Sequence, residues 1–270
     1  MKEYDFYIVP TPIGNLGDIT NRAIEVLKSV DVIACEDSRN TQKLLNHFSI
    51  TTKCLSYHKF NEKERVSQII AMIKEGKKVA LVSDAGTPLF CDPGSILVEE
   101  LKKENISVTA LPGANAVVTF LSQIPRDEEE FCFIGFLPKS KTQITEILHS
   151  HNNIDTIFYE SPNRLLNTLN TISEVFPRRK VSVARELTKV FEEVLTDTVE
   201  NLIDYFSQKE IKGEIVTLVH KFIEHDCIDK YTDKISALKN KKYSDKDISI
   251  IMSTLFNLNK NEIYEYLIKN

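Results

Sequence analysis

The fold of this chain is decided near its start, by Phe6-Tyr7-Ile8-Val9-Pro10-Thr11-Pro12-Ile13-Gly14-Asn15-Leu16-Gly17-Asp18-Ile19-Thr20. The first four residues form an apolar run of strand length, and Thr20 stands where a helix N-cap is expected. Two prolines and two glycines fix an irregular backbone between them, suited to close approach to a ligand. The stretch predicts a strand, a ligand-binding loop and a helix, with a plain tight turn as the alternative.

The same alternation continues downstream. Short apolar runs at Val32 to Cys35, Val79 to Val82 and Val108 to Leu111 predict further strands. Segments of helical period lie between them; one carries Val66, Ile69, Ile70 and Ile73 on one face. The pattern indicates an α/β fold with a largely parallel sheet.

A proline and a run of acids at Gln123 to Glu130 predict a domain boundary. Beyond it, further candidate strands are Phe131 to Phe136, Thr156 to Tyr159, Val181 to Arg185, Glu192 to Thr196 and Glu214 to His220, with a helix at Arg164 to Phe176. We therefore expect two α/β domains, residues 1–122 and 123–224.

The remaining residues, 225–270, predict a small helical module. Ser244 with Asp247, and Asn259 with Glu262, have capping-box spacing. Ile248, Ile251, Met252, Leu255 and Phe256 form a helical apolar face. The charges of the module nearly balance, so a packing or dimerisation appendage and an RNA-binding module both stay open.

Composition limits the function classes. The chain has 270 residues, 42% of them hydrophobic, a formal charge of −5 and a pI of about 5.8, so any RNA contact needs a local basic surface. Its five cysteines include no C-x-x-C pair, which indicates neither a zinc site nor a disulfide framework. The N-terminus is not a signal peptide, and Pro112, Gly113, Asn115 and Gln123 interrupt the uncharged stretch from Ile106 to Pro125, so we expect a cytosolic protein.

Two more loops follow predicted strands, where ligands bind in open α/β sheets. Ser83 to Pro88, continued by Asp92-Pro93-Gly94, gathers a carboxylate, hydroxyls and free amides that suit a small polar cofactor. A loop braced by an Asx-turn at Asp84 is the alternative. Leu111 to Ala116 is built of small residues, which close helix–sheet packing would also explain.

Several familiar motifs are absent. The chain has no G-x-G-x-x-G after the first strand, no G-x-x-x-x-G-K-[ST] and no G-x-S-x-G. These absences disfavour dinucleotide enzymes, P-loop nucleotidases and ordinary hydrolases.

The opening stretch resembles the signature of the bacterial small-subunit ribosomal RNA cytidine 2′-O-methyltransferases, in the tetrapyrrole-methylase superfamily. The resemblance continues through Glu36-Asp37-Ser38-Arg39, Ser56-Tyr57-His58, Ser83 to Pro88, Phe158 to Pro162, Ala184 to Lys189 and Lys212 to Val216. It differs from the family pattern at Ser38, Asn163 and Ala114-Asn115-Ala116. It covers Tyr7 to about Lys221, and less specifically the tail.

This resemblance implies two α/β domains, a homodimer and S-adenosylmethionine in the cleft between the domains. The residues that it places on the cofactor are Pro12, Ser83, Asp84, Gly86, Thr87, Gly113, Ala116, Tyr159, Ala184, Glu214 and Ile215. No metal is expected, because no ligand cluster has metal spacing.

Methyl transfer to a ribose hydroxyl needs in-line positioning and a nearby base. Glu36, Asp37, His58 and Glu160 follow predicted strands and are candidates, although an exposed acidic turn or a structural histidine would look the same. Arg39, Lys43, Arg164, Arg185 and Lys189 are candidates for phosphate contacts, with solvated or internally paired charges as the alternative. A tetrapyrrole methyltransferase and a non-catalytic ribosome-assembly factor are the competing functions.

Overall fold

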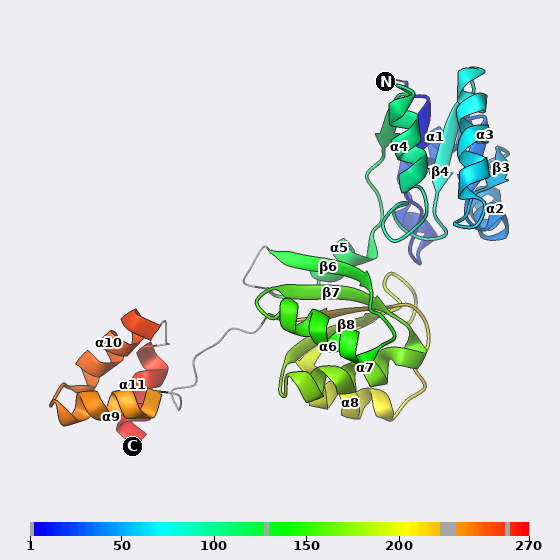
Figure 1. Cartoon of the computed structure of the whole chain (residues 1–270). Coiled ribbons are helices and arrows are strands. Elements are labelled where there is room, and N and C mark those ends of the chain that lie inside the picture. The colour runs from blue at the N-terminus through cyan, green and yellow to red at the C-terminus, as the bar shows by residue number, and fades with distance from the viewer. Residues whose placement is uncertain (1–2, 127–129, 222–230, 257–259, 270) are drawn as a thin grey trace. The chain divides into compact units, whose positions relative to one another are not determined.

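The computed structural model describes residues 3–126, 130–221, 231–256 and 260–269. The chain forms two compact units, Met1–His220 and Lys221–Asn270 (Figure 1). The domain end expected at residue 224 and the helix start expected at Asn259 lie outside the described residues. Within those residues Cys35, Cys54, Cys91 and Cys132 are free thiols.

The first sheet is wholly parallel, in the strand order β3-β2-β4-β1-β5. Its strands are β1 Phe6–Ile8, β2 Val32–Cys35, β3 Lys53–Ser56, β4 Val79–Val82 and β5 Val108–Ala110. Parallel strands end at the same edge, so the loops after β1, β2, β3 and β4 converge there.

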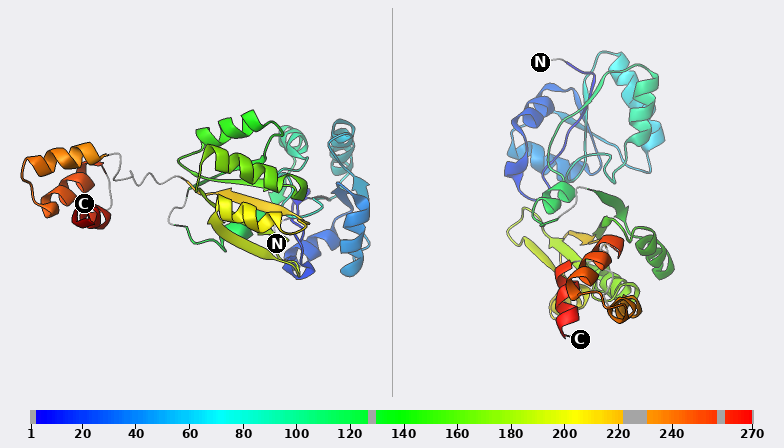
Figure 2. Two further views of the ribbon diagram at one scale, coloured as in Figure 1. Left: turned by 90° about the horizontal axis from the view of Figure 1, so that it is seen from below. Right: turned by 90° about the vertical axis from the view of Figure 1, so that its left-hand side faces the viewer.

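Helices cover both faces of this sheet (Figures 1 and 2). They are α1 Asn21–Ser29, α2 Ser38–His47, α3 Glu62–Lys74 and α4 Ser95–Lys103. Thr20 caps α1 by accepting a hydrogen bond from the Ala23 amide, as the sequence predicts. On one face α1 buries Val26 and Leu27, and on the other α3 and α4 bury residues such as Ile69 and Leu97.

The second sheet is mixed, in the order β6-β7-β10-β8-β9, and only the β6–β7 pair is parallel. Its strands are β6 Phe131–Phe136, β7 Asp155–Glu160, β8 Lys180–Arg185, β9 Glu193–Thr198 and β10 Ile215–Val219. The expectation of a largely parallel sheet therefore holds for the first sheet alone. A short loop joins β8 to β9, and such connections make antiparallel pairs.

Helices α6 Lys141–Ser150, α7 Pro162–Val175 and α8 Val199–Ser207 pack on this sheet through one hydrophobic cluster. The short helix α5, Ala116–Leu121, inserts Val117 and Phe120 against Ile157 and Leu218 of the second sheet. Helix α5 begins directly after the loop that follows β5. It therefore connects this loop of the first sheet to the hydrophobic core of the second sheet.

The second unit contains α9 Thr232–Asn240, α10 Asp245–Phe256 and α11 Lys260–Lys269. The Ser244 hydroxyl accepts from the Asp247 amide, so the predicted cap is confirmed. Ile248 and Met252 are buried with Ile235 and Ile263, whereas Leu255 is mostly exposed. No helix in the described parts of the chain is long and apolar enough to cross a membrane.

Candidate functional site

Hydrogen bonds lock together the three loops singled out in the sequence. Thr11 and Gly86 exchange backbone hydrogen bonds of 2.9 Å in both directions. The Thr11 hydroxyl donates to the Ser83 carbonyl, and the Thr87 hydroxyl donates to the Ala114 carbonyl, each at 3.0 Å. The loops after β1, β4 and β5 therefore form one braced surface.

A loop of the second sheet packs against this surface. The Asn15 amide donates to Thr188 Oγ1 at 3.1 Å. A Cβ added at Gly14 would lie 2.5 Å from Lys189 Cγ and 2.8 Å from the Leu187 carbonyl oxygen. Only glycine fits where the two loops cross, so this residue sets the spacing between them.

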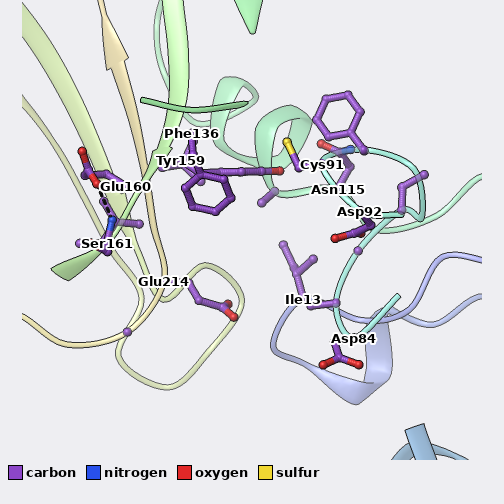
Figure 3. A pocket seen from close by; sticks show the side chains of 18 of the residues that line it. Ile13, Asp84, Cys91, Asp92, Asn115, Phe136, Tyr159, Glu160, Ser161 and Glu214 are labelled. Atoms are coloured by element: carbon purple, nitrogen blue, oxygen red, sulfur yellow. Dashed lines mark hydrogen bonds between the residues drawn. The ribbon is translucent and has the colours of Figure 1, made fainter. Parts of the chain in front are cut away.

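The braced loops and the second sheet enclose a cavity of about 420 Å³ (Figure 3). One wall carries Ile13, Asp84, Thr87, Cys91, Asp92 and Asn115. The facing wall carries Phe136, Tyr159, Glu214, Ile215 and Val216. The volume suits a drug-sized ligand. Flat apolar groups and carboxylates together line this site.

Seven of the eleven residues predicted to meet the cofactor line this cavity: Asp84, Gly86, Thr87, Ala116, Tyr159, Glu214 and Ile215. Pro12 lines an adjoining groove of about 280 Å³ that shares Ile13, Asp84, Ala85 and Glu214 with the cavity.

The other three predicted residues lie behind the cavity wall. Ser83 is buried, and its hydroxyl donates to the Gly86 carbonyl at 3.0 Å. Gly113 lets the chain cross Pro10, because an added Cβ would lie 2.5 Å from that proline's Cβ. Ala184 is fully buried in β8, paired with Val216.

The cavity residues Phe90, Cys91 and Phe136 were not predicted from the sequence, and Asp92 was predicted only as part of the continued Ser83 loop. The Phe90 ring stacks on Phe133 with centroids 4.6 Å apart. The signal for Asp92 was its place in the continuation of the Ser83 loop, but only the fold shows which carboxylates it approaches.

Three acids influence one another at the carboxyl edge of the first sheet. Burial, together with the carboxylates of Glu36 and Asp84, raises the pKa of Asp92 to about 6. Desolvation and the Asp84 charge also raise the pKa of Glu36, whereas the nearby His58 lowers it. An acid with a pKa close to neutrality, on a cavity wall, is suited to accept a proton.

Three of the residues predicted to be catalytic, Glu36, Asp37 and His58, lie beside the cavity rather than on its wall. Glu160 is on the wall, but its carboxylate is buried, accepts from the Thr168 hydroxyl and pairs with Arg164. Glu36 lines a small adjacent pocket with Asp92. Asp37 caps α2 and pairs with Arg39 at 2.8 Å, and hydrogen bonds from that arginine lower the Asp37 pKa to about 2. His58 lies just after the end of β3, and its buried Nδ1 has no hydrogen-bond partner among the residues that the structure describes.

Two of the predicted phosphate ligands have extensive internal partners. Arg164 donates to the Leu137 and Pro138 carbonyls and pairs with the buried Glu160. Arg185 pairs with Glu193 at 3.3 Å and donates to the Lys212 carbonyl.

The other three lie around the adjoining groove or beside it. Lys43 and Lys189 line the groove, and Lys189 also bridges Glu186 and Glu214 at 2.8 and 3.0 Å. The Arg39 side chain is 86% exposed on α2. Within the described ranges no group of three or more His, Cys, Asp or Glu residues is arranged to hold a metal ion.

A family model gives this architecture a class. Residues 5–203 match the model of the Tetrapyrrole (Corrin/Porphyrin) Methylases, a range that covers the first sheet and the second sheet up to β9. The chain is thus a tetrapyrrole-methylase-type methyltransferase by family.

Its relatives define the family more narrowly. It is 40% identical to the ribosomal RNA small subunit methyltransferase I of Buchnera aphidicola, over 97% of this chain and 96% of the relative. With the protein of the same name from Halalkalibacterium halodurans the identity is 47%, over 79% of this chain and 74% of the relative. The chain belongs to the ribosomal RNA small subunit methyltransferase I family.

Solved structures share the fold at low identity. Diphthine synthase matches with a TM-score of 0.66 at 14% identity, covering 84% of this chain and 96% of its own. Uroporphyrin-III C-methyltransferase from Thermus thermophilus, complexed with S-adenosylhomocysteine, matches with a TM-score of 0.57 at 15% identity, covering 79% and 96%. These likenesses show the fold alone.

Proposed function

We propose that this chain methylates the ribose 2′-hydroxyl of a cytidine in small-subunit ribosomal RNA, with S-adenosylmethionine as the methyl donor. The observation that carries the proposal is the cavity, which combines aromatic and aliphatic walls with carboxylates on opposite sides. The names of the relatives, which match along almost the whole chain, supply the class of RNA.

The cavity fits the methyl donor chemically. A sulfonium and an ammonium are cations, and Asp84, Asp92 and Glu214 provide negative charge around the space. Phe136 and Tyr159, whose ring centroids lie 5.4 Å apart, offer aromatic surface of the kind that attracts cations and packs on flat rings. When bound, S-adenosylmethionine supplies an activated methyl group; Asp84, Thr87, Ala116, Tyr159, Glu214 and Ile215 are the residues that would hold it.

The chain's own contribution to catalysis is orientation and proton acceptance. A ribose hydroxyl is a weak nucleophile until its proton is accepted. In our proposal Asp92 accepts that proton. Its pKa of about 6 leaves the carboxylate deprotonated near neutral pH and makes it a stronger base than an ordinary aspartate. Glu36 acts through Asp92, since its charge helps to raise that pKa.

The RNA backbone would pass the adjoining groove, where Lys43 and Lys189 lie, and the exposed Arg39 beside it. Arg164 and Arg185 are assigned to internal pairing instead. The family resemblance also implies a homodimer; sedimentation at micromolar concentration tests it, and a monomer would contradict it.

The proposal is tested by incubating the purified chain with methyl-labelled S-adenosylmethionine and small ribosomal subunits from a strain that lacks this methylation. Label should enter the small-subunit RNA and not large-subunit RNA. Cofactor binding without transfer would favour the ribosome-assembly alternative. Transfer to a uroporphyrinoid instead would favour the tetrapyrrole alternative, whose present support is fold likeness at under 20% identity.

A further inference from the structure

An exposed phenylalanine stands at the edge of the first sheet, next to the candidate site. Phe60 is 95% exposed, the highest value among the large hydrophobic side chains of the described residues. It lies in the short turn between β3 and α3. Its ring contacts His58 edge-on, with 6.1 Å between the centroids, and this is its only ring contact within the described part of the chain.

The backbone that presents Phe60 is held firmly. The Asn61 side chain accepts from the His58 amide at 2.8 Å and donates to the Ser56 carbonyl at 3.1 Å. Tyr57, fully buried, donates to Glu62 at 2.6 Å, and its amide donates to the Cys35 carbonyl. The turn is therefore ordered from both sides, while the ring at its tip has no packing role.

The turn lies at the same sheet edge as the reacting groups. Cys35 pairs with Ser56, so Glu36 and His58 leave neighbouring strands together, and His58 acts on the Glu36 charge. The strand order places β3 two positions from β4, whose loop lines the cavity. Two strand spacings amount to roughly 10 Å. A stacked nucleotide strand rises about 3.4 Å per residue, so this span corresponds to a few nucleotides.

The charges around Phe60 suit a polyanion. Lys59 and Lys63 are exposed on either side of it, with Glu64 as the opposing exposed acid. Exposed aromatic rings interleaved with cations are how proteins hold unpaired bases, because every base has a face that can stack.

We propose that Phe60 is a stacking platform for an unpaired base of the substrate RNA, one to a few nucleotides from the methylated residue. The inference rests on the proposed function, because it needs an RNA substrate. Phe60 determines how tightly the RNA is held and contacts neither the methyl donor nor the reacting hydroxyl.

The test compares substitutions at this one position, with unmethylated small ribosomal subunits as the probe. Phe60→Ala and Phe60→Leu should raise KM for subunits by roughly 5- to 150-fold, the range measured for lost base stacking. Phe60→Tyr and Phe60→Trp should keep KM near wild type. In all four variants kcat at saturating subunits and the Kd for S-adenosylmethionine should stay unchanged.

The leucine variant is the matched control, since it keeps apolar bulk and removes the aromatic face. A wild-type KM in Phe60→Leu would overturn stacking, as would an unchanged KM in Phe60→Ala. A shift in sedimentation of Phe60→Ala alone would assign the ring to contact with a second copy and would equally overturn the proposal. Failure of the wild-type chain to methylate subunits at all would be a failure of the proposed function, recognisable before any variant is made.

Discussion

At the scale of single residues, Asp92 lies on the cavity wall and has a raised pKa. Its carboxyl group lies with Asp84 on one wall, and burial near other acids holds its pKa at about 6. Neither property is visible in the sequence, because Glu36 comes from the loop after β2, and only the fold brings it to Asp84 and Asp92 of the loop after β4.

Asp92→Asn keeps the shape of the side chain and removes its basicity. We expect kcat to fall about 10²- to 10⁴-fold, the usual contribution of a general base. Wild-type kcat should rise with pH through about 6 and then level off, and the variant should lose that limb. Stopped-time methylation assays across pH measure both; a variant with the wild-type limb intact would rule out this role.

Asp92→Asn should lower kcat but raise the stability of the fold. The folded-state pKa of Asp92 is raised above the usual value of 3.8, so the native state holds the proton more tightly and loses stability as pH rises from about 4 to 6. Asp92→Asn should therefore raise Tm above pH 6 and leave it unchanged below pH 4. Thermal unfolding at pH 4 and pH 8 checks the sign, and a lower Tm at pH 8 would contradict it.

Arg164 and Arg39 look alike in sequence and differ in structure. Arg164→Ala removes donors to two carbonyls and leaves the buried Glu160 unpaired, so we expect a loss of about 1–3 kcal/mol in unfolding free energy. Arg39→Ala, at an exposed position, should change that energy by under about 0.5 kcal/mol. Urea denaturation of both variants tests this. Equal unfolding free energies would show that Arg164 behaves as an ordinary surface charge.

At the scale of elements, the loops rather than the strands hold the cavity in shape. The crossing at Gly14 joins the loop after β1 to the loop around Thr188. Any side chain at this position would push Leu187 and Lys189, in the loop between β8 and β9, away from the loop after β1.

Gly14→Ala should therefore weaken S-adenosylmethionine binding and cost about 1–3 kcal/mol of stability through overpacking. Gly17→Ala is the matched control, since an added Cβ there would meet only the Asn15 side chain, at 3.2 Å. Calorimetric titration of the cofactor compares the two. If Gly14→Ala binds as tightly as Gly17→Ala, the crossing does not shape the cavity.

Local pattern predicted most of the first sheet, because β1, β2 and β4 are buried apolar runs. The strand β3 carries only two apolar residues, Cys54 and Leu55, as an edge strand half-covered by packing does, so its pattern is weak. The antiparallel pairing of β10 with β7 and β8 joins residues far apart in sequence, which periodicity does not encode. The ligand loops were found from their glycines and prolines. Of the aromatic wall, Tyr159 was predicted from the family resemblance, whereas Phe136 was not, because it looks like any strand residue.

At the scale of the whole molecule, a net charge of −5 must be reconciled with an RNA substrate. The local cations available for this are Arg39, whose side chain is exposed although it pairs with Asp37, and Lys43, which lines the groove. Each of Arg39→Ala and Lys43→Ala should flatten the log–log dependence of subunit binding on salt by about 0.7–0.9, the share of one phosphate contact. Cofactor affinity should hardly change. Filter binding between low and high salt gives the slopes, and unaltered slopes in both variants would exclude this RNA path.

Nucleoside analysis shows most directly whether the methyl group reaches a ribose oxygen of cytidine. Small subunits from the unmethylated strain are treated with the chain and S-adenosylmethionine, and their RNA is digested to nucleosides for mass spectrometry. We expect a methylated cytidine at a single position, whose fragmentation leaves the methyl group on the sugar and releases an unmodified base. Asp92→Asn should form almost none of it. A methyl group on the base, or no methylated nucleoside from an otherwise folded and cofactor-binding protein, would contradict this expectation.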